Sequence, residues 1–318
     1  DYLGLAAHPD VIAALQEGAQ RYGVGSGASH LISGHSQAHV LLEERLAHLY
    51  SPYFDDARAL YLCTGYMANL ALMTSLARLD DDAVFFSERL NHASIIDGLR
   101  LARAKTHIYE HGDVAQLGQL LTDTPAALKV VVTDSVFSMD GNVAPLHQLA
   151  DLCRQRNAIL VIDDAHGFGV LGDRGLGGLE WVVQQARSYI YTTAAAPALA
   201  HALQTSLDLI TGAEGKQRRE CLAEHRATLR QYLHLQKWLA PKSDTAIQPV
   251  IIGANHAASQ VGSFLWHQGL WVAAIRPPTV PADTARLRIT LSAAHSRNEV
   301  TRLARAIAQA EQEYAGQE

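Results

Sequence analysis

An acid and an imidazole stand three residues apart at the end of a short apolar segment. Residues 158–162 have the composition of a buried strand, and Asp163-Asp164-Ala165-His166-Gly167 follow directly. In an open α/β sheet, ligands bind at the carboxyl ends of the strands. A carboxylate there can keep the nitrogen of a heteroaromatic ring protonated, and an imidazole can bind a phenolic oxygen on the same ring. The spacing of Asp163 and His166 therefore predicts a site for such a ring.

Gly65 and Tyr66 stand between a strand-like segment, residues 59–63, and a helical pattern. The glycine lets the backbone approach an anion, and the first N–H groups of the helix point at it. Tyr66 could flank a ring. An ordinary turn between a strand and a helix, with a tyrosine that packs in the core, would have the same sequence. This motif alone is weak.

His92 and Ser138 each follow a strand-like segment as well. His92 comes after Val84-Phe85-Phe86, where its ring could stack on a planar ligand, but Asn91 or Ser94 could equally be a helix cap beside an exposed histidine. Ser138 follows residues 129–134, a segment with four consecutive β-branched residues. A hydroxyl there could reach a ligand, although Asp140-Gly141 is ordinary turn sequence.

Two arginines near the C-terminus could bind a carboxylate. Arg286 and Arg288 lie on the same side of a predicted strand over residues 285–291. An arginine on a strand can bind a carboxylate through two parallel hydrogen bonds, although an exposed edge strand would also explain the pair. The segment before this strand, residues 276–281, contains three prolines and Thr279, and the prolines make it rigid.

The elements that must position these residues alternate along the first two thirds of the chain. Short links between strands and helices predict a largely parallel sheet with helices on both faces, an α/β fold. The predicted helices cover residues 11–22, 38–50, 66–79, 94–104 and 146–156, and the predicted strands cover residues 59–63, 83–86, 129–134 and 158–162.

The pattern changes after His201. A long helix over residues 215–239 precedes predicted strands at 247–252, 271–275 and 285–291, with helices over 257–268 and from about 298. This pattern predicts a smaller α+β domain. We therefore expect an N-terminal helix and glycine-rich loop over residues 1–40, a large domain over 41–205 and a small C-terminal domain over 206–318.

Composition argues against several classes of protein. The net charge is −6 and no basic run exceeds two residues, which argues against nucleic acid or an anionic membrane as partner. No apolar stretch has the length of a bilayer span, and no signal peptide is visible at Asp1. Three widely spaced cysteines show neither metal-site spacing nor a disulfide framework. We expect a cytoplasmic protein without a metal ion.

The strand-end motifs occur in one order, so all can face one crevice. Pyridoxal phosphate (PLP) presents the ring nitrogen and phenolic oxygen that Asp163 and His166 could bind. The motifs Asn91-His92-Ala93-Ser94, Phe137-Ser138-Met139-Asp140-Gly141 and Asp163-Asp164-Ala165-His166-Gly167 together resemble those of the α-oxoamine synthase family of PLP enzymes. The resemblance covers nearly the whole chain. It implies the aspartate-aminotransferase-like architecture, fold type I, and a homodimer.

The resemblance also implies roles for single residues. Asp163 would pair with the pyridine nitrogen, His166 would bind the phenolic oxygen, and the backbone at Gly65 and Tyr66 would help to hold the cofactor. Ser138 would add a polar contact beside it. With His92, Asp163 and His166 would be the catalytic residues.

The substrate residues follow from the same resemblance. His92 would stack on the ring and assist proton transfer, Arg288 would bind the amino-acid carboxylate, and Thr279 would contact substrate. Residues 244–250 and 274–281 most resemble the branch that condenses L-alanine with pimeloyl-CoA or pimeloyl-acyl carrier protein in biotin biosynthesis, with release of CO₂ and the thiol. Branches that use glycine with acetyl-CoA or succinyl-CoA are the alternative.

One residue of the family pattern is missing. The family carries a lysine in a Thr-x-Gly-Lys segment one crossover after the Asp163 strand. This chain has five lysines, none of them in such a context: Lys105, Lys129, Lys216, Lys237 and Lys242. Six glycines between 167 and 178 lead directly into a predicted helix over 181–188, and no strand returns to the sheet between Ile162 and Tyr189.

Two explanations fit this absence. The segment is deleted and the chain is a non-catalytic, lysine-free relative or subunit, or residues between Glu180 and Trp181 are missing from the sequence. Removing a strand from the centre of a parallel sheet would leave backbone N–H and C=O groups unpaired, which favours the second explanation.

Overall fold

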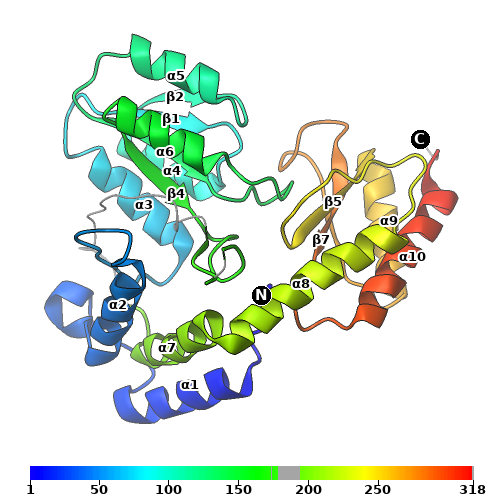
Figure 1. Ribbon diagram of the computed structural model, residues 1–318, viewed down its shortest axis with the longest axis horizontal. Helices are drawn as coiled ribbons and strands as arrows, with labels where there is room; N and C mark the ends of the chain where they lie inside the picture. Colours follow the sequence, from blue (N-terminus) through cyan, green and yellow to red (C-terminus); the bar gives the residue numbers. More distant parts are fainter. Residues whose placement is uncertain (173, 178–193, 317–318) are drawn as a thin grey trace. The chain divides into compact units, whose positions relative to one another are not determined.

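The computed structural model describes residues 1–172, 174–177 and 194–316 (Figure 1). The chain divides into two compact units. The large unit contains Leu5–Ser135 and Ala144–Ala213, and the small unit contains Asp1–Gly4, Val136–Val143 and Glu214–Glu318. The sequence did not indicate that the first four residues and the segment after Ser135 belong with the C-terminal part. The division into residues 1–40, 41–205 and 206–318 stays a prediction.

The described part of the large unit contains a parallel four-stranded sheet in the order β2-β1-β3-β4. The strands are β1 (Val84–Glu88), β2 (Lys105–Tyr109), β3 (Lys129–Asp134) and β4 (Ile159–Asp163). Each pairs in parallel with its neighbours. Because the strands are parallel, their last residues share one edge of the sheet, as the sequence predicted.

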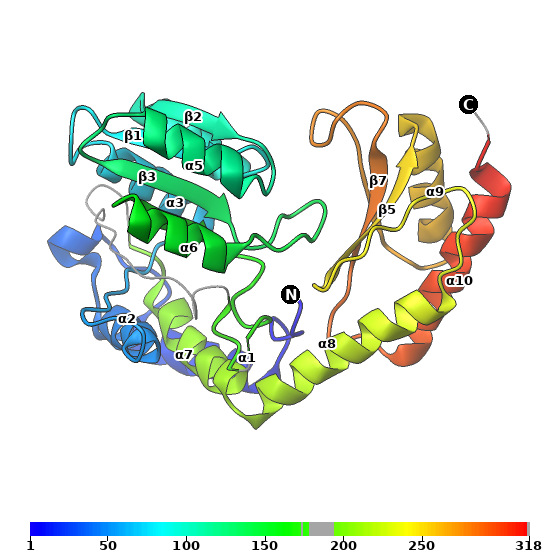
Figure 2. The same ribbon diagram turned by 45° about the horizontal axis from the view of Figure 1, so that its top comes forward.

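Both faces of this sheet are covered by helices (Figure 2). Helix α3 (Gly65–Leu76) precedes β1, and three helices follow strands: α4 (Ala93–Ala102), α5 (Val114–Asp123) and α6 (Leu146–Gln155). On one face, Met73 of α3 and Ile95 of α4 pack against Val130 and Val132 of β3. Successive strand side chains point to opposite faces, so buried Val131 faces the other layer, where α5 and α6 lie.

Three further helices of the large unit pack together (Figure 1). They are α1 (Pro9–Tyr22), α2 (Gln37–Tyr50) and α7 (Pro197–Thr211). Ala38 and Leu42 of α2 form a core with Ala200 and Leu207 of α7. A short π-helix, η1 (His30–Gly34), lies between α1 and α2.

The small unit is an antiparallel sheet with helices. Its strands β5 (Ile247–Gly253), β6 (Ala273–Ile275) and β7 (Ala285–Thr290) are ordered β5-β7-β6. The helices are α8 (Ala213–Tyr232), α9 (Asn255–His267) and α10 (Arg297–Tyr314). Helix α9 packs against all three strands and against α10. The predicted α+β character of this part is confirmed.

Two predicted elements were wrong. Residues 59–63 form no strand in the described structure. The Tyr61 N–H donates to the Glu43 carboxylate of α2 (2.9 Å) instead of joining a sheet ladder. The helix predicted over 215–239 ends at Tyr232, because the backbone N–H groups that follow bind the Glu311 carboxylate rather than continuing the helix.

Four elements of the described structure had no sequence prediction: η1, β2, α5 and α7. The predicted helix over 181–188 and the junction at 180/181 lie outside the described residues. Within the described part of the chain, we find no helix with the length and apolar character needed to cross a bilayer.

Candidate functional site at the strand ends

Asp163 ends β4 and is held by two N–H donors. Its Oδ2 accepts a hydrogen bond from the Asn69 side-chain amide (2.6 Å), and its Oδ1 accepts one from the Ala165 N–H (3.0 Å). Asn69 is buried on α3 and also donates to the Ser94 hydroxyl (2.9 Å) at the start of α4. The carboxylate is therefore oriented by one strand and two helices, and it is half-buried.

His92 lies beside the same edge, where it caps α4. The ring atom Nδ1 of His92 accepts the backbone N–H of Ser94 (3.2 Å). The backbone N–H of His92 donates to Asp134 Oδ1 (3.2 Å) at the end of β3. Asn91 Oδ1 in turn accepts the Asp134 N–H (3.0 Å). This reciprocal pairing fixes the loop before α4 on β3, while the His92 side chain is exposed.

Asp134 of the large unit is an acid with a strongly shifted pKa. It is buried, and burial together with the negative charge of Asp163 raises the pKa of Asp134 to about 8. The nearby Glu88 contributes in the same direction, and the hydrogen bond from the His92 N–H opposes it. Strongly perturbed carboxyl groups of this kind are frequent in functional sites.

The glycine-rich turn after β4 contains His166, which is half-buried. Asp164 accepts a hydrogen bond from the Ser135 hydroxyl and lies directly against two glycines. A Cβ atom at Gly167 would lie 2.1 Å from Asp164 Oδ1, and one at Gly177 would lie 1.8 Å from Oδ2. Asp164 lies so close to positions 167 and 177 that only glycine fits at either one. The resulting turn determines where His166 lies.

Gly65 opens α3 and faces open space. Thr64 caps the helix by accepting the Met67 N–H on its Oγ1 (3.1 Å), and no atom lies within 4 Å of the place where a Cβ of Gly65 would stand. This helix N-terminus has the free N–H groups and the space that an anion requires. The Tyr66 hydroxyl donates to Asp97 of α4 (2.8 Å), and this bond raises the pKa of Tyr66.

The small unit holds the remaining predicted residues. Arg288 Nε donates to the Ser138 carbonyl, and its other nitrogens contact Thr290 Oγ1 (2.9 Å) and the Tyr2 hydroxyl (3.4 Å). Arg286 is buried and forms an ion pair with Asp140. Thr279 is exposed in the turn after β6.

The eight predicted site residues thus fall into two groups. Gly65, Tyr66, His92, Asp163 and His166 belong to the large unit, and Ser138, Thr279 and Arg288 belong to the small unit. No role was predicted for Asn69 or Asp134 from the sequence. Both carried a signal, since Asn69 is a polar residue on an apolar helix and Asp134 ends a strand with four consecutive β-branched residues.

Neither lysine of the large unit lies at this edge. Lys105 and Lys129 open β2 and β3, so each stands at the opposite end of its strand, roughly 15 Å along the sheet from the carboxyl edge. Lys129 donates to the Leu121 carbonyl (2.6 Å). The other three belong to the small unit: Lys216 and Lys242 pair with Glu220 and Asp244, and Lys237 donates to the Ala315 carbonyl.

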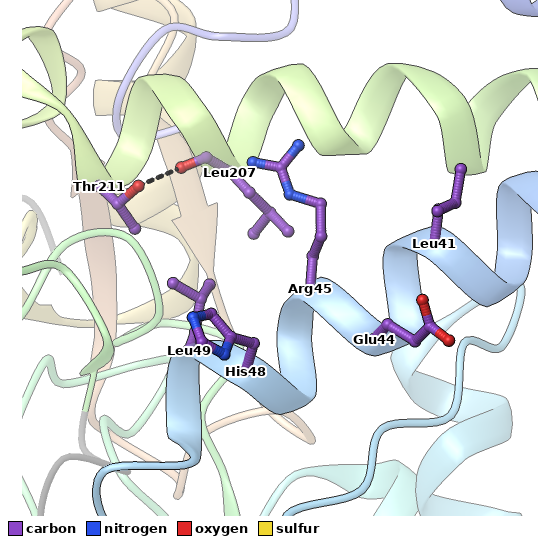
Figure 3. A pocket seen from close by; sticks show the side chains of 7 residues that line it. All are labelled: Leu41, Glu44, Arg45, His48, Leu49, Leu207 and Thr211. Carbon is purple, nitrogen blue, oxygen red and sulfur yellow. Dashed lines mark hydrogen bonds between the residues drawn. The ribbon is translucent and has the colours of Figure 1, made fainter.

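A separate hollow lies between α2 and α7 (Figure 3). It contains none of the predicted site residues, and Arg45 on its wall is paired with Asp208 of α7. Its lining consists of Leu41, Glu44, Arg45, His48, Leu49, Leu207 and Thr211. Among the described residues, no group of three or more histidine, cysteine, aspartate or glutamate side chains is placed to hold a metal ion.

Known proteins resemble this chain along nearly its whole length. The sequence model of a family described as aminotransferase class I and II matches residues 1–179 and 178–307. A protein of Janthinobacterium sp. (strain Marseille) named 8-amino-7-oxononanoate synthase is 56% identical over 98% of this chain and 88% of its own length. A protein of the same name from Bordetella petrii is 51% identical over 98% of this chain and 87% of its own length.

Solved structures share the fold. A serine palmitoyltransferase from S. paucimobilis, with PLP and myriocin bound, superposes with a TM-score of 0.90 at 26% identity, over 98% of this chain and 86% of that one. An 8-amino-7-oxononanoate synthase from Francisella tularensis has a TM-score of 0.78 at 24% identity, over 98% and 96% of the two chains. The predicted α/β, fold type I architecture is confirmed.

The Janthinobacterium relative has residues that this chain lacks. Its alignment runs over 347 positions, whereas this chain has 318 residues, so at least 29 positions have no counterpart here. The two matches to the family model meet at residues 178–179. That position is next to the junction at 180/181 where the sequence predicted a missing strand.

Proposed function

The chain belongs to the aminotransferase class I and II family, and on this basis we propose that it is a PLP-dependent α-oxoamine synthase that condenses L-alanine with a pimeloyl thioester. The observation that supports this substrate pair most strongly is the 50–56% identity, over nearly the whole chain, to proteins named 8-amino-7-oxononanoate synthase. The product would be 8-amino-7-oxononanoate, with release of CO₂ and the thiol of CoA or of acyl carrier protein.

The strand-end residues fit the ring and phosphate of PLP. Asp163 offers an oriented carboxylate for a ring nitrogen, His92 stands exposed beside it, and the open N-terminus of α3 at Gly65 suits a phosphate. His166, in the turn after β4, would bind the phenolic oxygen. When bound, PLP supplies the electron sink that stabilises a carbanion on the amino acid.

Each residue then has a definite task. Asp163 keeps the ring nitrogen protonated, because an opposite charge within hydrogen-bond distance favours the charged form of a base. His92 stacks on the ring and moves the proton at the α-carbon of alanine. Its backbone is fixed by Asp134, so the imidazole is placed before substrate arrives.

In the small unit, we assign the alanine carboxylate to Arg288. Arg286 is the weaker candidate because it is buried and already forms an ion pair with Asp140. Arg288 instead makes hydrogen bonds to neutral oxygens, including a long one to the Tyr2 hydroxyl, which a carboxylate can displace. Ser138 lies against the same guanidinium, and Thr279 would contact the substrate.

The lysine of the family belongs, in this proposal, to the segment that the relatives have and this chain lacks. Neither lysine of the large unit lies at the carboxyl edge of the sheet, and the other three lysines belong to the small unit. We therefore expect the 318-residue chain to bind PLP without a covalent bond. Catalysis would require the protein with the missing segment in place.

A second copy of the chain is the proposed partner. Exposed apolar side chains are concentrated in the segment between α1 and α2, where Val24, Leu31 and Ile32 are 84%, 58% and 80% exposed. Apolar side chains grouped in this way usually mark an interface. We expect a homodimer in the cytoplasm that covers these three side chains, with a size that sedimentation analysis would show.

Product formation tests the proposed reaction. The 318-residue chain and a variant that carries the Janthinobacterium segment between Glu180 and Trp181 would be incubated with PLP, L-alanine and pimeloyl-CoA, and 8-amino-7-oxononanoate would be measured by mass spectrometry. We expect product only from the second protein. Glycine with acetyl-CoA or succinyl-CoA is the control, and preference for either pair would contradict the assignment.

A second candidate is a lysine-free, non-catalytic subunit, which the position of all five lysines favours. The intact mass of the protein isolated from its source separates the two cases. A mass of 34.5 kDa means that the segment is absent from the native protein. A mass several kilodaltons larger means that the native protein contains it.

A further inference from the structure

Three buried or half-buried carboxyl groups end neighbouring strands of the large unit. Asp134 of β3 and Asp163 of β4 are register partners, so their side chains stand on the same face of the sheet, with Cβ atoms about 5 Å apart. Glu88 ends β1 on the other side of β3, and it is buried as well. Two ionised carboxylates at such a distance repel each other, and burial increases the repulsion.

The three carboxyl groups differ in the hydrogen bonds and contacts that stabilise a negative charge on them. Asp163 accepts N–H bonds from Asn69 and Ala165, and Glu88 accepts the Leu90 N–H and contacts His111 (2.8 Å). Asp134 is 3% exposed, and its carboxyl accepts the N–H of His92. Of the neighbouring pair, Asp163 is therefore better able to carry the negative charge.

We propose that Asp134 is a positioning residue that keeps its proton in the resting protein, fixes His92 by accepting its N–H, and leaves the negative charge of this edge on Asp163. The inference rests on the proposed function only for the identity of the ring that Asp163 binds. If Asp134 is neutral, the negative charge stays on the half-buried Asp163. That carboxylate can then pair with the protonated nitrogen of the ring.

The electrostatics agree with this geometry. Burial and the charge of Asp163 raise the pKa of Asp134 to about 8, with a further contribution from Glu88, against an ordinary value near 3.9 in an unfolded chain. The folded protein therefore binds one proton more than the unfolded chain between about pH 4 and pH 8. The stability that this proton contributes is complete below about pH 4 and is lost as the pH rises to about 8.

The substitution Asp134→Asn tests the protonation. An asparagine keeps an oxygen that accepts the His92 N–H, but it cannot ionise. Urea unfolding of both proteins without cofactor would be followed at pH 5, 6, 7 and 8. The ratio of the unfolding constant of the native protein to that of the variant should rise with pH, by up to about tenfold per unit. Parallel pH profiles would overturn the proposal.

Asp163→Asn provides a matched control in the same experiment. It removes a charge that opposes ionisation of Asp134 and so lowers the pKa of Asp134 in the folded protein. The pH dependence attributed to Asp134 should therefore end at a lower pH and span a smaller total change in stability. A control profile identical to that of the native protein would show that the two carboxyl groups do not interact, which also contradicts the proposal.

Hydrogen exchange tests the positioning of His92. In Asp134→Ala the His92 N–H loses its acceptor, so exchange in the peptide that contains it should accelerate at least tenfold, whereas Asp134→Asn should keep the native rate. Equal protection in both variants would contradict the positioning role. All three measurements use protein without PLP, so a failure here leaves the proposed reaction standing, and a failure to form product leaves this inference standing.

Discussion

Asn69, which was not singled out from the sequence, connects α3, α4 and the end of β4 in the candidate site. Its amide donates to Asp163 at the end of β4 and to Ser94 at the start of α4, from a buried place on α3. A bond to an ionised acceptor is stronger than one between neutral groups, so the Asp163 contact dominates. Asn69 therefore sets the direction in which the Asp163 carboxylate points.

The substitution Asn69→Ala should disorient Asp163 without removing its charge. We expect the affinity for PLP to fall about tenfold and the free energy of unfolding to fall by about 1–3 kcal/mol, because buried hydrogen bonds to Asp163 and Ser94 are lost. Equilibrium dialysis and urea unfolding measure the two effects. Asn255→Ala, at the exposed start of α9, is the control. Native PLP affinity in Asn69→Ala would contradict this role.

At the scale of elements, the close contact of α1 with α7 depends on a glycine. A Cβ atom at Gly18 would lie 2.9 Å from the Ala198 carbonyl oxygen and 3.0 Å from Ala198 Cα. Backbone atoms cannot move aside as a flexible side chain can. The two helices can therefore approach as they do only because residue 18 has no side chain.

Gly18→Ala should lower the free energy of unfolding by about 1–3 kcal/mol through overpacking. Gly118→Ala is a matched control on α5, where the nearest atom to the new Cβ would be a Leu152 methyl at 3.7 Å. That change should stabilise the protein by about 0.5–1 kcal/mol, since alanine is the better helix former. Thermal or urea unfolding of both variants measures the difference, and equal effects would refute the contact argument.

The end of α8 depends on a carboxylate from α10. Glu311 is 4% exposed, and its two oxygens accept the N–H groups of Gln236, Lys237 and Trp238 (2.7–2.8 Å). The segment after α8 is thereby anchored to the last helix of the small unit.

Glu311→Gln should cost about 2–4 kcal/mol of unfolding free energy, because an amide has one acceptor oxygen and its NH₂ group would face backbone donors. Glu313→Gln, an exposed position on the same helix, should change the free energy by less than about 0.5 kcal/mol. Urea unfolding of the two variants compares them, and a small effect at Glu311 would show that the anchor is not needed.

At the scale of the whole molecule, the sequence predicted the parallel sheet and the edge where its strands end. The run Lys129–Asp134 has the same bounds in the structure as in the prediction, because buried β-branched residues carry a strong local signal. Strand β2 was missed because it lies at the edge of the sheet and exposes Lys105, Thr106 and Ile108, so its sequence lacks an apolar pattern.

The partners of the site residues could not be predicted in the same way. Asn69 and Asp163 are 94 positions apart in the chain, and His92 and Asp134 are 42 apart. Periodicity reports only which face of an element is buried, so it cannot say which polar groups meet across elements. The strand-end motifs placed Asp163 and His92 at one edge, and the structure adds the two residues, Asn69 and Asp134, that orient them.

Retention of PLP by the 318-residue chain tests the central claim most directly, since that claim is that Asp163 at the end of β4 binds the ring of PLP. Equilibrium dialysis of PLP would compare the native chain with Asp163→Ala. We predict that the native chain binds PLP and that the variant binds it about 100-fold more weakly, since the charge pair between Asp163 and the ring nitrogen is lost. Equal binding by both proteins, or no binding by the native chain, would contradict the claim.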